Sequence, residues 1–222
     1  MDKAVADLTE LLLRVERCRL CPTIAPYRKF PAPHRGTAKY GLMIVGEAPG
    51  RVSLNNGRAF SNPRNLTIRR GFARALAPAP VELEEAFYLT DVVKCWPAKG
   101  LTANRSPKAA EIRTCAGRFL SQELDLIKPR LVMTFGALAA RAVIDQKVSL
   151  TQIHGRAIDS PRGFKVVPLV HPSTINITGM RRAGIRSLLE YEELLARLFK
   201  AHIPREVMVE LADPHRTPLV DR

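Results

Sequence analysis

The sequence predicts an α/β fold, a three-layer α/β/α sandwich built on a four-stranded parallel sheet. Four short runs of apolar residues are continuous rather than alternating, which is typical of strands buried on both faces. Segments with helical spacing of apolar residues lie between these runs, and strands separated by helices pair in parallel. At 222 residues the chain is long enough to bury a sizeable core without disulfide bonds.

The first half of the chain contains two predicted helices and two predicted strands. Residues 4–16 place apolar side chains at helical spacing, whereas residues 17–40 carry four prolines and many basic residues and predict an irregular segment. Residues 41–45 predict a buried strand, which Gly46 follows. Residues 65–77 then predict a helix that prolines stop, and residues 87–93 predict the second strand.

The second half continues the alternation of helix and strand. Ser106 and Pro107 predict a helix start, with serine as the N-cap and proline in the first turn, and the helix runs to about Lys128. The other predicted elements are the strands 131–135 and 165–170 and the helices 137–144 and 183–201. Pro168 lacks an N–H group, which favours an edge position or a local irregularity for the last strand.

These elements predict one domain over residues 1–202, followed by a C-terminal tail over residues 203–222. The tail has few apolar anchors, so we expect it to be extended or poorly ordered. No run of 18 apolar residues exists and the N-terminus lacks a signal-peptide core. We therefore expect a cytoplasmic protein with no membrane partner. Two separate expectations are a monomer and a bacterial or archaeal cell.

The net charge of +14 favours a polyanionic partner, nucleic acid first. Three long segments, 17–46, 48–81 and 160–189, contain several arginines and lysines but no acidic residue. Unopposed positive charge in such segments is typical of proteins that bind a phosphate backbone. The alternative is a generally basic protein whose arginines are merely solvated.

Three polar residues follow or end predicted strands: Glu47, Asp91 and His171. In open α/β sheets ligands bind outside the carboxyl ends of the strands, so we expect these side chains to converge on one rim. The alternative is three unrelated polar residues in turns. The sequence lacks the phosphate-loop, dinucleotide-binding and zinc-deaminase signatures.

The four cysteines, Cys18, Cys21, Cys95 and Cys115, match a complete four-thiolate site. Zinc and an iron–sulfur cluster both accept four thiolates. A Cys-x-x-Cys redox motif, two disulfides, or core positions for Cys95 and Cys115 are the alternatives, and disulfides are disfavoured in a reducing cytoplasm.

An ordered set of motifs between Cys18 and about Glu193 resembles the uracil-DNA glycosylase superfamily, most closely its iron–sulfur-containing family 4. The matching pieces are Cys18-x-x-Cys21, Gly46-Glu47-Ala48-Pro49-Gly50, Gly57-Arg58-Ala59-Phe60, Tyr88 to Cys95, Asn104-Arg105-x-Pro107, Cys115 and His171-Pro172-Ser173. The resemblance implies a DNA repair enzyme that flips uracil out of single- or double-stranded DNA and hydrolyses its N-glycosidic bond, leaving an abasic site.

The resemblance also implies residue roles. Glu47 and His171 would be catalytic, the first orienting water or balancing charge on the sugar and the second donating to a base oxygen. A structural [4Fe–4S] cluster, rather than zinc, would bind Cys18, Cys21, Cys95 and Cys115. The implied base-binding residues are Gly46, Ala48, Phe60, Asp91 and Ser173. The implied DNA contacts are Arg58, Asn104, Arg105, Arg181 and Arg182, and the candidate wedges are Ile175, Ile177 and Met180.

Asp91 departs from the family, which typically has asparagine at this position. An asparagine amide accepts from uracil N3–H and donates to O4, whereas an ionised carboxylate can only accept. A protonated Asp91 could mimic asparagine, other groups could read the base, or the enzyme could prefer another deaminated base. A non-catalytic DNA-binding module is a further alternative.

Overall fold

The computed structural model describes residues 3–24, 35–63, 66–100, 102–146, 148–173 and 176–216. Within these residues six strands form one sheet in the order β1-β3-β2-β6-β8-β7. The four central strands, β3, β2, β6 and β8, run parallel, which confirms the predicted four-stranded parallel sheet. Two-residue strands add one antiparallel pairing at each edge. The strands are β1 (Arg35–Gly36), β2 (Leu42–Gly46), β3 (Tyr88–Asp91), β6 (Leu131–Phe135), β7 (Ile158–Asp159) and β8 (Lys165–Leu169).

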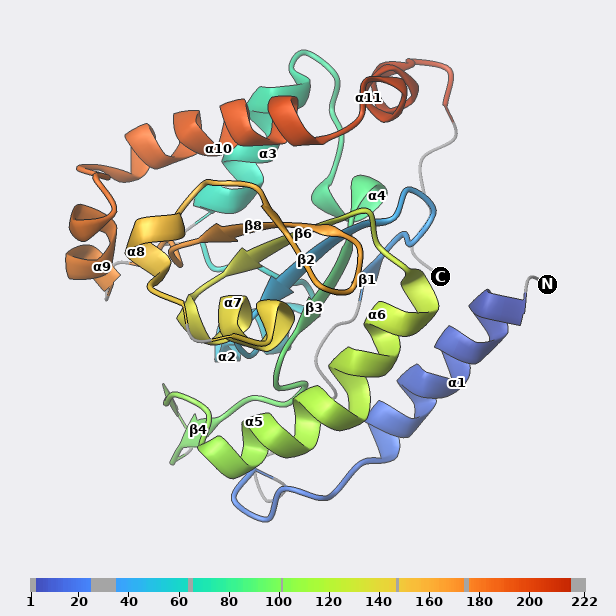
Figure 1. The fold of residues 1–222 in the computed structure, drawn as a ribbon, viewed down its shortest axis with the longest axis vertical. Coiled ribbons are helices and arrows are strands. Elements are labelled where there is room, and N and C mark those ends of the chain that lie inside the picture. Colours follow the sequence, from blue (N-terminus) through green and yellow to red (C-terminus); the bar gives the residue numbers. More distant parts are fainter. Residues whose placement is uncertain are drawn as a thin grey trace.

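Helices cover both faces of this sheet, as Figure 1 shows, so the predicted three layers are confirmed. Alternate side chains of a strand point to opposite faces. Ile44 of β2 therefore packs toward α3 (Thr67–Leu76) and α10 (Leu188–His202), while its neighbour Met43 packs toward α6 (Ser121–Ile127) and α7 (Ala137–Ile144). The N-terminal helix α1 (Lys3–Arg17) lies against α6.

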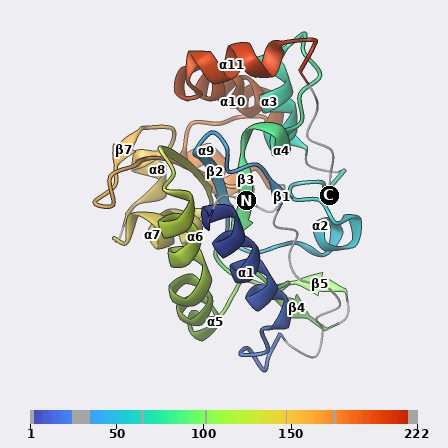
Figure 2. The ribbon, with the colours of Figure 1, turned by 90° about the vertical axis from the view of Figure 1, so that its right-hand side faces the viewer.

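The smaller elements lie mostly in the connections between strands and helices. A separate hairpin of two short strands lies apart from the main sheet, as Figure 2 shows for the view turned by 90°. The elements are α2 (Arg51–Asn56), α4 (Leu83–Ala86), β4 (Ala98–Lys99), β5 (Ala103–Asn104), α5 (Ala109–Cys115), a π-helical segment (Ala116–Leu120), α8 (Leu150–Ile153), α9 (Ile177–Arg182) and α11 (Arg205–Ala212). No helix in the described ranges combines the length and the apolar character that crossing a lipid bilayer requires.

The long helix after β3 begins later than the serine and proline signal predicts. Its N-cap is Lys108, whose backbone N–H donates to Oε2 of Glu111 at 2.7 Å. Because Glu111 satisfies an N–H at this point, the helix starts at Ala109, and Ser106 with Pro107 leads into it. The predicted helix 183–201 is likewise shorter at its start, where Ser187 accepts from the N–H of Glu190.

The expectation of an extended tail from residue 203 is wrong for residues 205–212, which form α11. Val207 and Leu211 lie one helical turn apart and are both buried in the main core. Ion pairs from Glu206 to Arg130 and from Glu210 to Lys39 hold the exposed side of the helix. Residues 217–222 lie outside the described residues.

Pro168 lies where the prediction places it, at the effective edge of the parallel sheet. It pairs with Thr134 of β6 on one side, whereas the short β7 reaches only Lys165 and Val166 on the other. Because no strand pairs with Pro168 on its outer side, its lack of an N–H group costs the sheet no hydrogen bond there.

Candidate active site

The three polar residues predicted to converge lie at the carboxyl ends of three of the four parallel strands. Asp91 ends β3, Glu47 follows β2, and His171 lies two residues beyond the end of β8. Strand β6 lies between β2 and β8 and contributes Gly136 at its end. The strands therefore bring a carboxyl group, a second carboxyl group and an imidazole to one rim of the sheet.

Gly46 brings Asp91 and Phe60 together. It is the register partner of Asp91, and a β-carbon on Gly46 would lie 2.2 Å from Oδ1 of Asp91 and 3.4 Å from Cζ of Phe60. Only glycine lets the carboxyl group and the ring approach the same backbone so closely. Phe60 has a positive φ of 53° and is partly buried, with its ring centroid 5.9 Å from that of Phe135.

The Asp91 carboxyl group is in an environment that disfavours its charge. Burial raises its pKa from 3.8 to about 7, with the charge of Lys94 opposing this rise and the charges of Glu123 and Glu47 adding to it. The residue as a whole is only partly buried. Asp91 therefore lies in a confined place that a ligand can reach.

Glu47 points across the rim toward the start of α7. Its Oε1 accepts a hydrogen bond from the backbone N–H of Leu138 at 3.1 Å. A β-carbon on Gly136, which has a φ of 106°, would lie 2.2 Å from the same oxygen. Burial raises the pKa of Glu47, while the Leu138 hydrogen bond and the charge of Arg141 oppose the rise.

His171 is fixed through its backbone and through the residue before it. Its carbonyl oxygen accepts from the N–H of Ser173 at 2.9 Å and from Nδ2 of Asn176 at 3.1 Å. The N–H of Val170 donates to Nδ1 of His154 at 3.2 Å. Burial lowers the pKa of His171, so the imidazole is neutral near pH 7 and still carries one N–H donor.

The predicted DNA-contacting residues fall into two groups. Arg181 and Arg182 end α9 and are exposed. Arg58, Asn104 and Arg105 already bind protein groups. Arg58 pairs with Glu82 and Glu84, Asn104 Oδ1 accepts from Trp96 Nε1 and the Arg51 N–H, and Arg105 pairs with Glu111.

Ala48 and the candidate wedge residues differ in how far they are exposed. The Ala48 side chain packs against the apolar cluster around the cysteines, which leaves its backbone as the part nearest the rim. Among the candidate wedges, Ile177 is half exposed, whereas Met180 is 5% exposed and belongs to the core. Ile175 lies outside the described residues.

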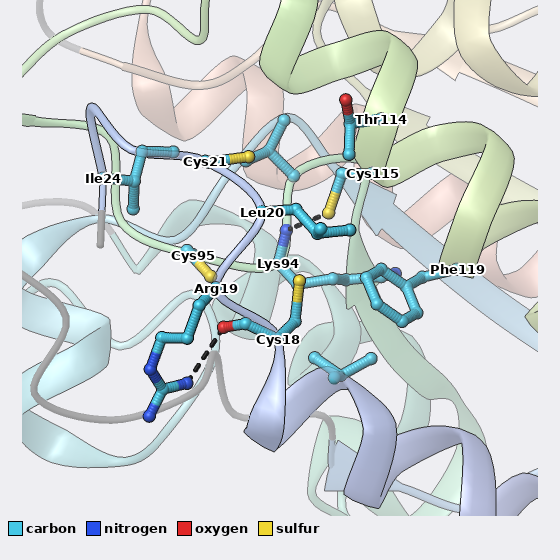
Figure 3. A pocket seen from close by; sticks show the side chains of 12 residues that line it. Cys18, Arg19, Leu20, Cys21, Ile24, Lys94, Cys95, Thr114, Cys115 and Phe119 are labelled. Atoms are coloured by element: carbon cyan, nitrogen blue, oxygen red, sulfur yellow. Dashed lines mark hydrogen bonds between the residues drawn. The ribbon is translucent and has the colours of Figure 1, made fainter.

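The four cysteines line one pocket, which Figure 3 shows with their sulfur atoms around it. They come from three segments: the loop after α1, the stretch after β3 and the end of α5. None forms a disulfide, and the N–H of Lys94 donates to Sγ of Cys115 at 3.2 Å. Taken over the described ranges, no three His, Cys, Asp or Glu side chains are close enough together to hold a single metal ion.

Sequence reasoning missed a buried ion pair between the two sites. Nζ of Lys94 lies 2.5 Å from Oε2 of Glu123, and the two side chains are 1% and 0% exposed. The same nitrogen donates to Oγ1 of Thr90 at 2.6 Å and to the carbonyl oxygen of Asp91 at 2.7 Å. Glu123 falls on the buried side of a helix, where an acid is rare unless paired, and this was the signal available in the sequence. The role of Gly136 was also missed, although its place directly after a strand pointed to the rim.

This chain is similar to known proteins over most of its length. Residues 33–196 match the family model of the uracil DNA glycosylase superfamily. A type-4 uracil-DNA glycosylase of Pyrobaculum aerophilum is 29% identical, with 90% of this chain and 96% of the relative covered. A type-4 uracil-DNA glycosylase of Thermotoga maritima is 32% identical, with 72% and 78% covered. A type-5 uracil-DNA glycosylase of P. aerophilum is 31% identical, with 80% and 87% covered. With most of its length matched, this chain belongs to the uracil DNA glycosylase superfamily.

Proposed function

We propose that this chain is a DNA repair glycosylase that hydrolyses the bond between uracil and deoxyribose and leaves an abasic site. The observation that carries the proposal is the position of Asp91, Glu47 and His171 at the carboxyl ends of three strands of one parallel sheet, with the Phe60 ring close to Gly46. The names of the relatives, of both type 4 and type 5, support uracil as the base.

The base must leave the DNA stack before the chain can act on it. In the proposed complex the flipped uracil stacks on Phe60, and the backbone of the turn from Gly46 to Gly50 approaches it without side-chain bulk. We expect Arg181 and Arg182 to contact phosphates, because both residues are exposed and no acid lies nearby in the sequence. Contacts of Arg58, Asn104 and Arg105 with DNA stay predictions.

Bond cleavage needs charge stabilisation at two places. As the C1′–N1 bond breaks, its electron pair goes to the base, and negative charge builds on the uracil oxygen O2. The N–H of His171 donates to that oxygen, and a neutral donor suffices for this. The Glu47 carboxylate lies on the sugar side, where it orients the water that bonds to C1′, accepts its proton and balances the positive charge on the sugar.

The four cysteines fit a [4Fe–4S] cluster. Thiolates are the ligands of such clusters, and all four sulfur atoms line the same pocket. A bound cluster would supply iron–thiolate bonds that join the loop after α1 to the stretch after β3 and to α5.

The test is single-turnover release of uracil from a single-stranded oligonucleotide by the wild type, Glu47→Gln and His171→Ala. Each variant should release uracil at least about 100-fold more slowly while binding the oligonucleotide as tightly as the wild type does. Glu10→Gln, an exposed acid on α1, is the matched control and should keep the wild-type rate. Full activity of both site variants would overturn the assignment, and tight binding without release by the wild type would show a binding module instead.

A further inference from the structure

The Asp91 carboxyl group lies where a ligand can reach it, yet it has few bonds to the rest of the protein. The carboxyl group lies against Gly46 on the rim, and the Phe60 ring, on which a flipped base would stack, approaches the same glycine. Within the described residues, no hydrogen bond to either carboxyl oxygen is found, although the backbone carbonyl of Asp91 is bonded to Lys94. A buried carboxylate without a hydrogen bond or an ion pair is costly, so this carboxyl group is arranged either for a ligand or for its neutral form.

The nearest cation cannot serve as a partner for the carboxyl group. Lysine has three N–H donors, and those of Lys94 go to Thr90, to the Asp91 backbone and to Glu123. Glu123 also balances the charge of Lys94. In the loop that carries Phe60, Arg58 is paired with Glu82 and Glu84.

The remaining charged groups around Asp91 favour a proton on it. Glu47 follows Gly46 on the neighbouring strand, and Glu123 faces β3 from α6; both raise the pKa of Asp91, whereas Lys94 lowers it. Burial against Gly46 and Phe60 acts in the same direction as the two acids. The side chain is therefore largely a carboxylic acid at pH values below about 7.

We propose that Asp91 reads uracil as a carboxylic acid, with its O–H donating to O4 and its carbonyl oxygen accepting from N3–H. This inference rests on the proposed function and adds to it a requirement for one proton on the base-reading side chain. A neutral carboxyl group offers one donor and one acceptor, as an asparagine amide does, whereas the ionised form offers acceptors only and repels O4. Uracil recognition by this chain is then lost as the pH rises, and an amide at residue 91 removes that loss.

The experiment compares the wild type with Asp91→Asn, both carrying whatever metal they bind as purified. Single-turnover release of uracil from a single-stranded oligonucleotide is measured from about pH 5.5 to pH 8.5. The ratio of the Asp91→Asn rate to the wild-type rate cancels the titrations that both proteins share, including those of Glu47 and His171. We expect a constant ratio at acidic pH and a rise of about tenfold per pH unit above the pKa of Asp91.

Asp145→Asn is the matched control, because it makes the same chemical change at an exposed residue at the end of α7. It should follow the wild-type pH profile. A ratio for Asp91→Asn that stays constant over the whole range would overturn the inference and leave the proposed function intact. Absence of uracil release by both proteins at every pH would overturn the proposed function and the inference with it.

Discussion

The proton on Asp91 has a consequence for stability that needs no substrate. The pKa of this carboxyl group is 3.8 without the fold and about 7 within it. Between these values the folded state holds a proton that the unfolded state has released, so the free energy of unfolding falls as the pH rises. Below a pH of 3.8 the carboxyl group does not lower the free energy of unfolding, and above a pH of about 7 the loss is complete.

The full penalty is about 4 kcal/mol, from roughly 1.4 kcal/mol for each unit between the two pKa values. About 3 kcal/mol of it accrues between about pH 5 and pH 8. Asp91→Asn keeps the size of the side chain and removes the titration. The stability of this variant relative to the wild type should therefore increase by about 3 kcal/mol over that pH range, or roughly 10 °C in Tm for a chain of this size.

The assay is urea unfolding of both proteins at the two pH values, with Asp145→Asn as the control for the loss of a surface charge. The comparison uses the change in the stability difference with pH, so any constant effect of the amide on packing cancels. An equal stability difference at both pH values would refute the reasoning, because it would mean that Asp91 is ionised in the fold throughout.

Three further predictions follow from other parts of the site. Gly136→Ala should slow uracil release at least about 100-fold in single-turnover kinetics, because the added β-carbon would displace the Glu47 carboxyl group. Gly117→Ala is the control and should keep the wild-type rate, because a β-carbon there would meet open space. Lys94→Met should cost about 3–5 kcal/mol in urea unfolding, because the buried Glu123 carboxylate then loses its counter-charge and keeps only hydrogen bonds such as those from Tyr88 and Thr90. The double variant Lys94→Met with Glu123→Leu should recover much of that loss, and equal losses in the single and double variants would contradict the role of the pair. Cys115→Ser should lower the iron content per purified chain below that of the wild type, whereas Thr114→Ser beside it should not, and equal iron contents would count against the four-cysteine site.

The parallel sheet was predictable because its central strands are short segments rich in apolar residues. Strands β2 and β6 are buried along their whole length, and β3 and β8 are buried except at one end residue, as a sheet covered on both faces requires. The two-residue strands β1 and β7 were not predicted, since they are too short to show a pattern. The helix α11 was missed because it has few apolar anchors, Val207, Met208 and Leu211, and its ion pairs with Lys39 and Arg130 join residues far apart in the sequence.

The site residues were predictable where a polar side chain lies at or directly after the end of a strand. Glu47, Asp91 and His171 could be placed on one rim from topology alone. The partners that set their properties could not be predicted, because the Leu138 N–H, Gly136 and the Lys94–Glu123 pair reach them only through tertiary packing. For the same reason, the sequence did not show that Arg58 and Arg105 already bind acidic side chains.

The most direct test of the account is base release by the wild-type protein from single-stranded oligonucleotides at about pH 6.5, where Asp91 holds its proton. The oligonucleotides each carry one uracil, hypoxanthine, xanthine or unmodified cytosine, and alkali cleaves the chain at any abasic site. The account predicts strand cleavage at uracil, at a rate that falls at least about 100-fold in Glu47→Gln. Tight binding of all four oligonucleotides with no cleavage at uracil would contradict it.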